Sequence, residues 1–266
     1  MPEGLEVEIW RRRAVSLTGR TVTLVQVDPR VADPDLVDLV TGTRITDVGR
    51  RGKVLTLTLR SDALPRERVL AIRFGMTGRL VVDGDAPIDR LEYASGRDRP
   101  EWDRLRLWTG ADADEHDVPA LRMNDPRRLG SLRIDPDLSA LGVDVFDVDE
   151  SSFDAAIAHR TAAVKTVLLD QSVVAGLGNL CADEVLFHSA ISPHRRCDDL
   201  DPAHRRALVV AIGTHLPEML ARGGSTAGVL DPALRAGPGV CPLDGGTLRR
   251  DAIGGRTAVW CPRHQR

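Results

Sequence analysis

The sequence has 266 residues, of which 42% are hydrophobic and 28% are charged, and its formal net charge at pH 7 is −3. These values are ordinary for a globular chain of one large domain or two modest ones. No apolar run is long enough to cross a bilayer, so we expect no membrane partner. The 4 cysteines are scattered and no signal peptide is apparent, which excludes a disulfide framework and favours a cytoplasmic location.

The chain begins with a proline directly after the initiator methionine. Because proline is small, we expect Met1 to be removed, which leaves Pro2 with a free secondary amine. An α-amino group has a reference pKa of about 7.7–8.0, against about 10.4 for lysine, so much more of it is uncharged at neutral pH. Such an amine can attack the C1′ atom of a sugar and form an iminium, as catalytic lysines do with carbonyl groups.

Two acidic residues follow the proline at a spacing of three. Glu3 and Glu6 share one face if a helix begins here. The apolar positions that favour one amphipathic helix are Leu5, Ile9, Trp10 and Leu17. Carboxylates in a first turn also suit the positive end of the helix dipole, so the acidic start alone does not establish a catalytic role.

Short segments with β-branched or alternating residues follow this helix. They span residues 21–27, 44–48, 54–59, 69–74, 80–82, 104–108 and 121–123. So many strands after one helix predict a β-sandwich-like domain.

The second half of the sequence has a helical pattern. Helices are predicted at residues 151–160, 166–169, 180–189 and 202–222, the first with Ser151 or Ser152 as its N-cap. A glycine-rich turn at residues 176–178 separates two of them. Helix N-termini bind anions readily, so this turn can direct backbone N–H groups at a phosphate.

The basic residues suggest where an anion would bind. The net charge argues weakly against a nucleic-acid partner, but phosphate binding depends on local clusters rather than on the sum. Nearly every cation is arginine, and the only lysines are Lys53 and Lys165. Where arginine fills the generic basic positions, a lysine suggests a need for a compact point charge.

Five stretches, in this order, resemble the formamidopyrimidine-DNA glycosylase and endonuclease VIII family. They begin with Met-Pro-Glu-x-x-Glu-Val-Glu at residue 1 and continue with Arg-Arg-Gly-Lys-Val-Leu at 50, Phe-Gly-Met-Thr-Gly-Arg-Leu at 74, Asn-Asp-Pro-Arg-Arg-Leu-Gly at 124, and Asp-Gln-Ser-Val-Val-Ala-Gly-Leu-Gly-Asn-Leu-Cys-Ala-Asp-Glu at 170. The last stretch is long and specific, and the resemblance covers essentially the whole chain.

The resemblance implies an α+β fold with a definite domain order. The expected parts are an N-terminal helix with a catalytic β-sandwich domain at residues 1–134, a linker at 135–150, a helical helix-two-turn-helix DNA-binding domain at 151–236, and a zinc-finger-like β-hairpin at 237–266. We expect a monomer that binds damaged double-stranded DNA in the bacterial cytoplasm, at the nucleoid.

The function that the resemblance implies is base excision repair by a DNA glycosylase with abasic-site (AP) lyase activity. Pro2 would attack C1′ of an everted nucleotide, and Glu3 would act as general acid toward the ring oxygen of the sugar. Glu6 would orient the sugar, and Lys53 would contact the phosphate and assist β,δ-elimination. Two alternatives stay open: a non-catalytic binder of damaged DNA, and an enzyme that is mainly an abasic-site lyase.

Several residues match DNA contacts of the family. They are Met76, Arg127, Leu129, Lys165, Gly178, Asn179 and Arg256. The first three would enter the duplex and fill the gap left by the everted base. The next three would bind phosphates that flank the lesion, and Arg256 would contact the phosphate at the lesion. Met76 could equally be a core methionine, and Asn179 could also be a helix N-cap.

The C-terminus resembles the family's four-cysteine zinc finger, with two substitutions. Cys241-x2-Asp244 is followed, after sixteen residues, by Cys261-x2-His264. Zinc accepts cysteine, histidine and aspartate ligands, so one structural Zn²⁺ is chemically allowed, although a carboxylate is unusual in such a site. Alternatively, Asp244 is a turn residue and the hairpin binds no zinc.

The segment after residues 223–226 bears on the substrate. Family members that excise 8-oxoguanine carry a long capping loop here, whereas in this chain only a short Gly/Pro/Ala-rich segment separates Thr226 from Cys241. This resembles the endonuclease VIII branch. We therefore expect a preference for oxidised pyrimidines, ring-opened purines or abasic sites over 8-oxoguanine.

Overall fold

The computed structural model describes the chain except for residues 1, 63–64, 89–90, 93–95, 111–113 and 115. Met1, and with it the expected removal of that residue, lies outside the described residues. The chain divides into two compact units. The first contains Pro2 and Glu6–Leu138, and the second contains Glu3–Leu5 and Ser139–Arg266. The division after Leu138 falls inside the segment predicted as a linker.

The first unit is a β-sandwich with short helices. Its helices are α1 (Gly4–Ala14, which starts in the second unit), α2 (Leu36–Val40) and the 3₁₀ turns η1 (Val15–Leu17) and η2 (Pro100–Trp102). Its strands are β1 (Val22–Val27), β2 (Arg44–Arg51), β3 (Val54–Arg60), β4 (Arg68–Arg73), β5 (Arg79–Val82), β6 (Asp103–Thr109), β7 (Leu121–Asn124) and β8 (Ser131–Ile134).

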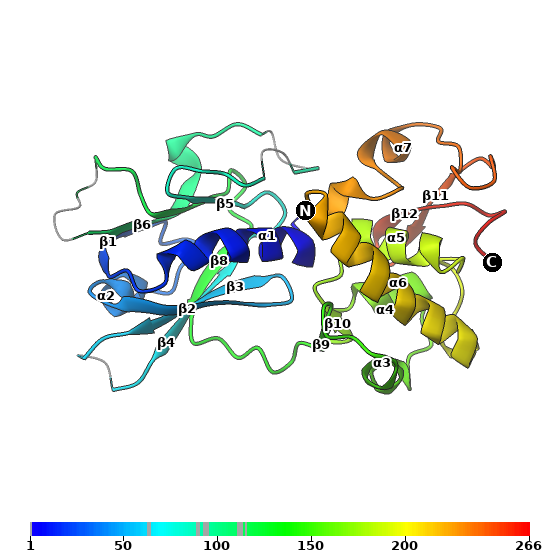
Figure 1. Ribbon diagram of the computed structural model, residues 1–266, viewed down its shortest axis with the longest axis horizontal. Helices are drawn as coiled ribbons and strands as arrows, with labels where there is room; N and C mark the ends of the chain where they lie inside the picture. The colour runs from blue at the N-terminus through cyan, green and yellow to red at the C-terminus, as the bar shows by residue number, and fades with distance from the viewer. Residues whose placement is uncertain (1, 63–64, 89–90, 93–95, 111–113, 115) are drawn as a thin grey trace. The chain divides into compact units, whose positions relative to one another are not determined.

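These strands form two four-stranded antiparallel sheets, with orders β1-β6-β7-β5 and β2-β3-β4-β8 (Figure 1). The sandwich predicted from the sequence is therefore confirmed. The prediction missed β8, which pairs with β4 through partners such as Leu70 and Ile134. Only Leu132 of its four residues is buried, so the segment lacks the repeated apolar alternation that marks a strand.

The core of this unit lies between the sheets and beneath α1. Alternating residues of β3, including Leu55, Leu57 and Leu59, are buried there. Trp10 of α1 packs against Phe74, with ring centroids 4.3 Å apart. This contact fixes the turn after β4 against the helix that follows Pro2.

The second unit is mainly helical. Its helices are α3 (Glu150–Ile157), α4 (Val164–Leu169), α5 (Asn179–His188), α6 (Pro202–Ala221) and α7 (Pro232–Ala236), with 3₁₀ turns η3 (Cys197–Asp199) and η4 (Ser225–Ala227). Its strands are β9 (Val143–Asp144), β10 (Val174–Ala175), β11 (Arg249–Ile253) and β12 (Arg256–Trp260). Strands β9 and β10 pair in parallel, and β11 and β12 form an antiparallel hairpin (Figure 1).

One local prediction in this unit, the N-cap of α3, was wrong. The N-cap of α3 is Asp149, not Ser151 or Ser152: Asp149 accepts the Ser152 N–H at 2.7 Å, and the Ser152 hydroxyl accepts the Asp149 N–H, which makes a capping box. The predicted linker, residues 135–150, contains β9 and the first residue of α3, and the division between the two units falls inside it.

Candidate functional site

A small pocket of about 220 Å³ lies at Pro2, within the first unit. Its lining residues are Pro2, Lys53, Arg73, Phe74, Gly75, Leu129 and Ser131. The fold thus brings Pro2, Lys53 and Leu129 together from three separate stretches. With Met1 removed, as expected from the sequence, this cavity would carry an amine, a cation and an exposed apolar side chain, which together would suit a ligand with a sugar, a phosphate and a base.

Lys53 lies in the two-residue turn of the β2–β3 hairpin, where Arg51 pairs with Val54. Gly52 precedes it with a φ of +56°, a conformation that favours glycine. Arg50 braces this turn, because its guanidinium donates to the Gly52 carbonyl at 2.8 Å. The same guanidinium contacts the Glu8 carboxylate at 3.4 Å.

Glu8 links the first helix to the Lys53 turn, a role the sequence did not reveal. It accepts hydrogen bonds from Arg11 at 2.8 Å and from Arg12 at 2.9 Å. Burial acts to raise the pKa of Glu8, but the hydrogen bonds and charges of these arginines outweigh it and lower the pKa to about 2. Glu8 lies beyond the first turn of α1, where the sequence gave no signal for this role, and it organises a cluster of cations.

Glu3 is buried in the second unit, at the start of α5. Its carboxylate accepts the backbone N–H groups of Gly178, Leu180 and Cys181 at 2.9, 2.8 and 3.0 Å. The first N–H groups of a helix have no carbonyl partner within the helix, and the helix dipole favours a negative group there. Glu3 therefore caps α5 from a distant part of the sequence.

Gly178 is the residue immediately before α5, and Asn179 is the first helical residue. The alternative interpretation of Asn179 as the N-cap is therefore wrong. A Cβ atom at position 178 would overlap the Glu3 side chain, so only glycine fits. The Asn179 Oδ1 atom is buried, and no donor in the described part of the chain reaches it.

The residues predicted to enter the duplex lie on two turns of the first unit. Met76 is half-buried in the turn between β4 and β5, and Arg127 is exposed in the turn between β7 and β8. Leu129 has 47% of its surface exposed, which is high for a large apolar side chain beside a well-packed sheet. Glu6, predicted to orient the sugar, is buried within α1.

Lys165 is completely buried. Its ammonium donates to Asp183 at 2.6 Å and to the Thr257 carbonyl at 2.7 Å. Asp183 also accepts from Arg235 at 2.8 Å. Burial lowers the pKa of Lys165, and the Asp183 charge opposes that change. In this structure the ammonium thus faces protein partners, although the sequence predicts a phosphate contact.

Arg256 is exposed at the tip of the β11–β12 hairpin. The turn before it is Gly254-Gly255, with φ values of +57° and +73°, as a tight hairpin turn requires. A Cβ atom at Gly254 would lie 2.7 Å from the Thr166 hydroxyl oxygen, so the tip packs closely on α4. The Arg256 side chain at this tip is exposed to solvent.

The predicted zinc ligands come together only in part. One ligand atom each from Cys241, Asp244 and Cys261 lies within 4.8 Å of the others, and among the described residues His264 is not in this group. Its Nε2 atom instead donates to the Phe187 carbonyl at 2.7 Å. Asp244 also accepts the Gly246 N–H at 2.7 Å, so it is a turn residue as well. The donor set therefore fits three positions of a tetrahedral zinc site.

The two finger thiols belong to a small apolar core of their own. Cys241 and Cys261 pack with Phe187, Leu248 and Val259. Burial raises the pKa of the Cys241 thiol, which favours its neutral form when no metal is bound. The hairpin therefore has packing that does not depend on a metal ion.

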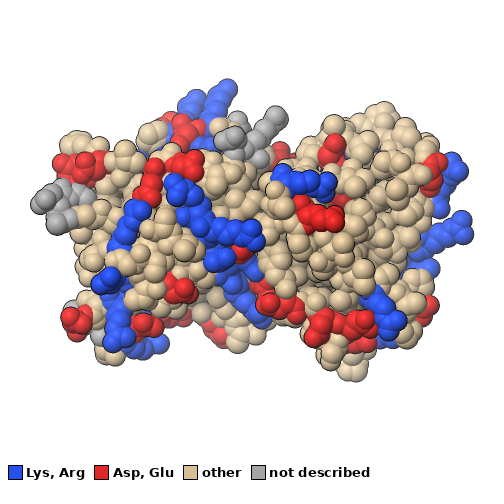
Figure 2. Space-filling model, in the orientation of Figure 1, with Lys and Arg blue, Asp and Glu red and all other residues tan. Residues whose placement is uncertain are grey.

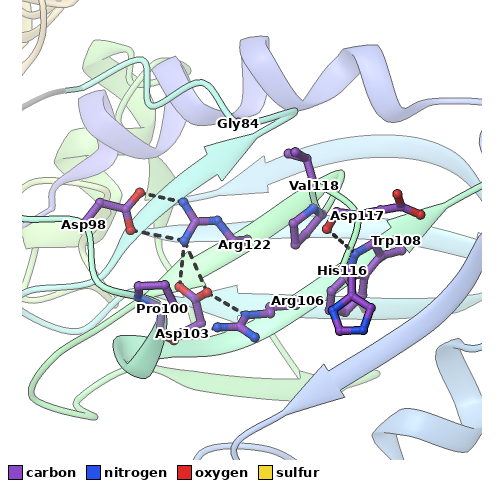
Figure 3. A pocket seen from close by; sticks show the side chains of 11 residues that line it. Gly84, Asp98, Pro100, Asp103, Arg106, Trp108, His116, Asp117, Val118 and Arg122 are labelled. Atoms are coloured by element: carbon purple, nitrogen blue, oxygen red, sulfur yellow. Dashed lines mark hydrogen bonds and ion pairs between the residues drawn. The ribbon is translucent and has the colours of Figure 1, made fainter. Parts of the chain in front are cut away.

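A second pocket of the first unit contains none of the predicted residues (Figure 3). Its cations are already paired: Arg122 contacts Asp98 at 2.6 Å and Asp103 at 3.2 Å, and Arg106 contacts Asp103 at 2.7 Å. The Trp108 indole donates to the Asp117 carbonyl. Because the carboxylates neutralise these arginines, the pocket is poorly suited to a phosphate.

Charges of both signs are interleaved over the face shown in Figure 2, so that face has no large purely basic field. With a net charge of −3, phosphate binding would depend on local basic groups, as the sequence indicates. Among the described helices, none has both the length and the apolar character that crossing a bilayer requires.

Known proteins resemble this chain over its whole length. The Formamidopyrimidine-DNA glycosylase N-terminal domain matches residues 1–132, and the Formamidopyrimidine-DNA glycosylase H2TH domain matches residues 141–231. The chain belongs to the formamidopyrimidine-DNA glycosylase family. Proteins named formamidopyrimidine-DNA glycosylase from Halorhodospira halophila and Stenotrophomonas maltophilia are 35% and 34% identical to it, each over 100% of both chains.

Solved structures of this glycosylase family agree with the fold. Wild-type Lactococcus lactis Fpg (MutM) in complex with DNA containing N7-benzyl-Fapy-dG matches with a TM-score of 0.80 and 25% identity, over 100% of both chains. The family resemblance and the α+β fold expected from the sequence are thus confirmed. The chain is a DNA glycosylase of base excision repair.

Proposed function

We propose that the Pro2 amine is the nucleophile of this glycosylase and that the enzyme is also an abasic-site lyase. The observation that carries the proposal is the pocket shared by Pro2 and Lys53. A terminal secondary amine beside a cation can bind a sugar-phosphate and attack its C1′ atom. The amine acts only after Met1 has been removed.

The chemistry then proceeds through a covalent intermediate. The Pro2 nitrogen bonds to C1′ and gives up its proton, which leaves with the base as the C1′–base bond breaks. The ring oxygen then takes a proton and the sugar ring opens to give an iminium. Loss of a C2′ proton lets the electron pair displace the 3′ phosphate, and loss of the C4′ proton then displaces the 5′ phosphate. Water finally hydrolyses the iminium and restores the free amine.

Three side chains assist these steps. Glu3, the next residue after Pro2, supplies the proton to the ring oxygen, and its hydrogen bonds to α5 hold the carboxyl in one position. Glu6 orients the sugar hydroxyl. Lys53 holds the phosphate and stabilises its charge as it leaves.

On the DNA side, we propose that a monomer binds damaged duplex DNA. Met76, Arg127 and Leu129 fill the gap left by the everted nucleotide, which offsets lost stacking. The N–H groups near Gly178, the Asn179 side chain and the Arg256 guanidinium bind phosphates. For Lys165 we propose an indirect contribution, in which its buried ion pair fixes the hairpin that carries Arg256.

The segment after Thr226 supports the proposed substrate preference. It is short, and several contacts hold it: Arg235 pairs with Asp183, Arg250 donates to the carbonyls of residues 234 and 235, and the Leu230 N–H bonds to Glu184. A short, fixed segment is poorly suited to fold over a purine. We propose that oxidised pyrimidines, ring-opened purines or abasic sites are preferred to 8-oxoguanine. Faster excision of 8-oxoguanine than of thymine glycol in matched duplexes would reject this.

We further propose that the finger binds one structural Zn²⁺ through Cys241, Asp244 and Cys261, with His264 as the fourth ligand. The bond from His264 Nε2 to the Phe187 carbonyl leaves Nδ1 as the nitrogen with a lone pair, and metal-binding histidines usually make such a second bond. When bound, the ion would hold the hairpin and take no part in the reaction.

The experiment that tests the function compares protein with and without Met1 on lesion-containing and abasic duplexes. Loss of strand scission with retained duplex affinity in the Met1-bearing form supports the proposal. If the processed form binds damaged DNA but never cleaves it, the protein is a non-catalytic binder. If single-turnover rates are fast only on abasic DNA, it is mainly a lyase.

A further inference from the structure

The two turns that carry the wedge residues are joined by one buried carboxylate. Asp125 has no exposed surface, and its two oxygens accept four hydrogen bonds. One oxygen accepts the Thr77 hydroxyl at 2.6 Å and the Arg127 N–H at 3.2 Å. The other accepts the N–H groups of Leu129 and Gly130 at 2.7 and 2.8 Å. Asp125 thus holds its own turn and the turn containing Met76.

The same turns also interlock through their backbones. Gly75 has a φ of +60°, and a Cβ atom there would run into the Leu129 carbonyl group. The Gly78 N–H closes the Met76 turn by bonding to the Phe74 carbonyl at 2.9 Å. Neither turn can therefore move far without the other.

A second carboxylate supports the outer side of the Asp125 turn. Asp28 accepts Arg104 and Arg128, each at 2.9 Å, and Arg104 also donates to the Asp125 carbonyl at 2.8 Å. Arg128 has a φ of +54°, a conformation that is unfavourable for a residue with a side chain. Its bond to Asp28 helps to hold that conformation, which leaves its neighbours Arg127 and Leu129 exposed.

We propose that Asp125, through its bond to Thr77, is a positioning residue that presents Met76, Arg127 and Leu129 as one rigid wedge. The inference rests on the proposed function, because it assumes that these three side chains enter the duplex. A wedge must be stiff to be useful: side chains that are already fixed lose little conformational entropy when they replace a base in the stack. A buried carboxylate with four donors supplies that stiffness.

The test removes the hydrogen bond between Thr77 and Asp125 by a substitution that changes the side-chain shape as little as possible. Thr77→Val deletes the hydroxyl that reaches Asp125, and Thr77→Ser keeps it. Thr43→Val is the matched control, because Thr43 is also buried and donates to the Val40 carbonyl at 2.6 Å, yet contacts neither wedge turn. Leu129→Ala is the positive control, because it removes a side chain that is proposed to insert into the duplex.

Wedge insertion is read without chemistry, from the fluorescence of 2-aminopurine placed beside a tetrahydrofuran abasic analogue in a duplex. We expect Thr77→Val to weaken formation of the fluorescent complex about tenfold, the equivalent of one lost hydrogen bond to a charged group. Thr77→Ser and Thr43→Val should behave like wild type. The loss in Thr77→Val combined with Leu129→Ala should be smaller than the sum of the two single losses, since both act through one wedge.

A second readout separates the wedge from the proposed chemistry. Borohydride trapping on a single-stranded abasic oligonucleotide needs no wedge, so Thr77→Val should trap as wild type does. Absence of trapping by wild type would overturn the proposed function, while the fluorescence assay would still test the wedge. A Thr77→Val protein that gives the wild-type fluorescence response, or loses no more than Thr43→Val, would overturn the inference about Asp125. So would an additive loss in the double variant.

Discussion

The Glu3 carboxylate occupies the space that a side chain at Gly178 would need. Its Oε2 atom accepts the Gly178 N–H at 2.9 Å, and a Cβ atom at residue 178 would overlap the Glu3 side chain. Two residues separated by 175 positions thus depend on each other. Glu3, which follows the proposed nucleophile directly in the sequence, is thus held at the start of α5.

This relationship predicts a large effect from the smallest possible substitution. Gly178→Ala should displace the Glu3 carboxylate, lower the melting temperature, and reduce borohydride trapping of abasic DNA by about tenfold or more, since misplaced catalytic groups cost rate steeply. Gly213→Ala is the matched control. Gly213 lies inside α6 with no atom within 4 Å of an added Cβ, so alanine should raise stability by about 0.5–1 kcal/mol. Wild-type trapping by Gly178→Ala would show that Glu3 need not be held there.

The Glu8 cluster predicts a specific dependence of stability on pH. The pKa of Glu8 falls from 4.5 to about 2 on folding, so its stabilising contribution is present above about pH 4.5 and is lost as the pH drops toward 2. Glu8→Gln should therefore reduce the free energy of unfolding at pH 7 by about 1–2 kcal/mol, and the difference from wild type should shrink below pH 4.

Chemical denaturation at several pH values measures this difference. Glu101→Gln is the control. Glu101 is exposed and forms a surface ion pair with Arg99 at 3.5 Å, and such exposed pairs contribute little to stability. A Glu8→Gln defect that stays constant down to pH 2 would contradict the cluster.

Lys165 and Arg256 should differ in how they affect DNA binding. Lys165→Met leaves Asp183 with one cation fewer in a buried site, so we expect a loss of roughly 3 kcal/mol of stability and an unchanged salt dependence of DNA affinity. Arg256→Gln should leave stability unchanged and reduce the slope of log affinity against log salt by about 1. A reduced slope for Lys165→Met would instead support the phosphate contact expected from the sequence.

Substitutions of the proposed zinc ligands Asp244 and His264 should change zinc binding in opposite directions. Native mass spectrometry should find one Zn²⁺ per chain, and chelation should lower the melting temperature. Asp244→Cys should resist chelation better than wild type, because thiolate is the usual ligand of structural zinc. His264→Asn should reduce the zinc content. A wild-type chain without zinc, equally stable with and without chelator, would show that the apolar packing around Cys241 and Cys261 is sufficient.

The sequence predicted the elements whose signals are local. Alternating leucines marked β3, and the run from Pro202 marked α6, because each pattern is set by the period of its own backbone. The pocket that joins Pro2 to Lys53 was expected from the family resemblance alone, since no local pattern relates a chain terminus to a hairpin turn more than fifty residues away.

What the sequence could not predict depends on contacts between distant residues. Three acidic residues have partners that lie far along the chain or on other elements. Glu3 caps α5, Glu8 binds Arg50 beside the Lys53 turn, and Asp125 links two turns. Lys165 shows the reverse case. The scarcity of lysine suggested a compact point charge and the family resemblance suggested a phosphate contact, whereas Asp183 and the Thr257 carbonyl satisfy the Lys165 charge inside the unit.

The most direct test of the account is to locate the covalent bond to DNA. Wild-type protein is trapped with borohydride on an abasic oligonucleotide, digested, and the modified peptide is sequenced by tandem mass spectrometry. If Pro2 is the nucleophile, we predict a single reduced adduct on the nitrogen of Pro2, in a peptide that lacks Met1. An adduct on Lys53 or any other amine, or strand cleavage by protein that retains Met1, would contradict it.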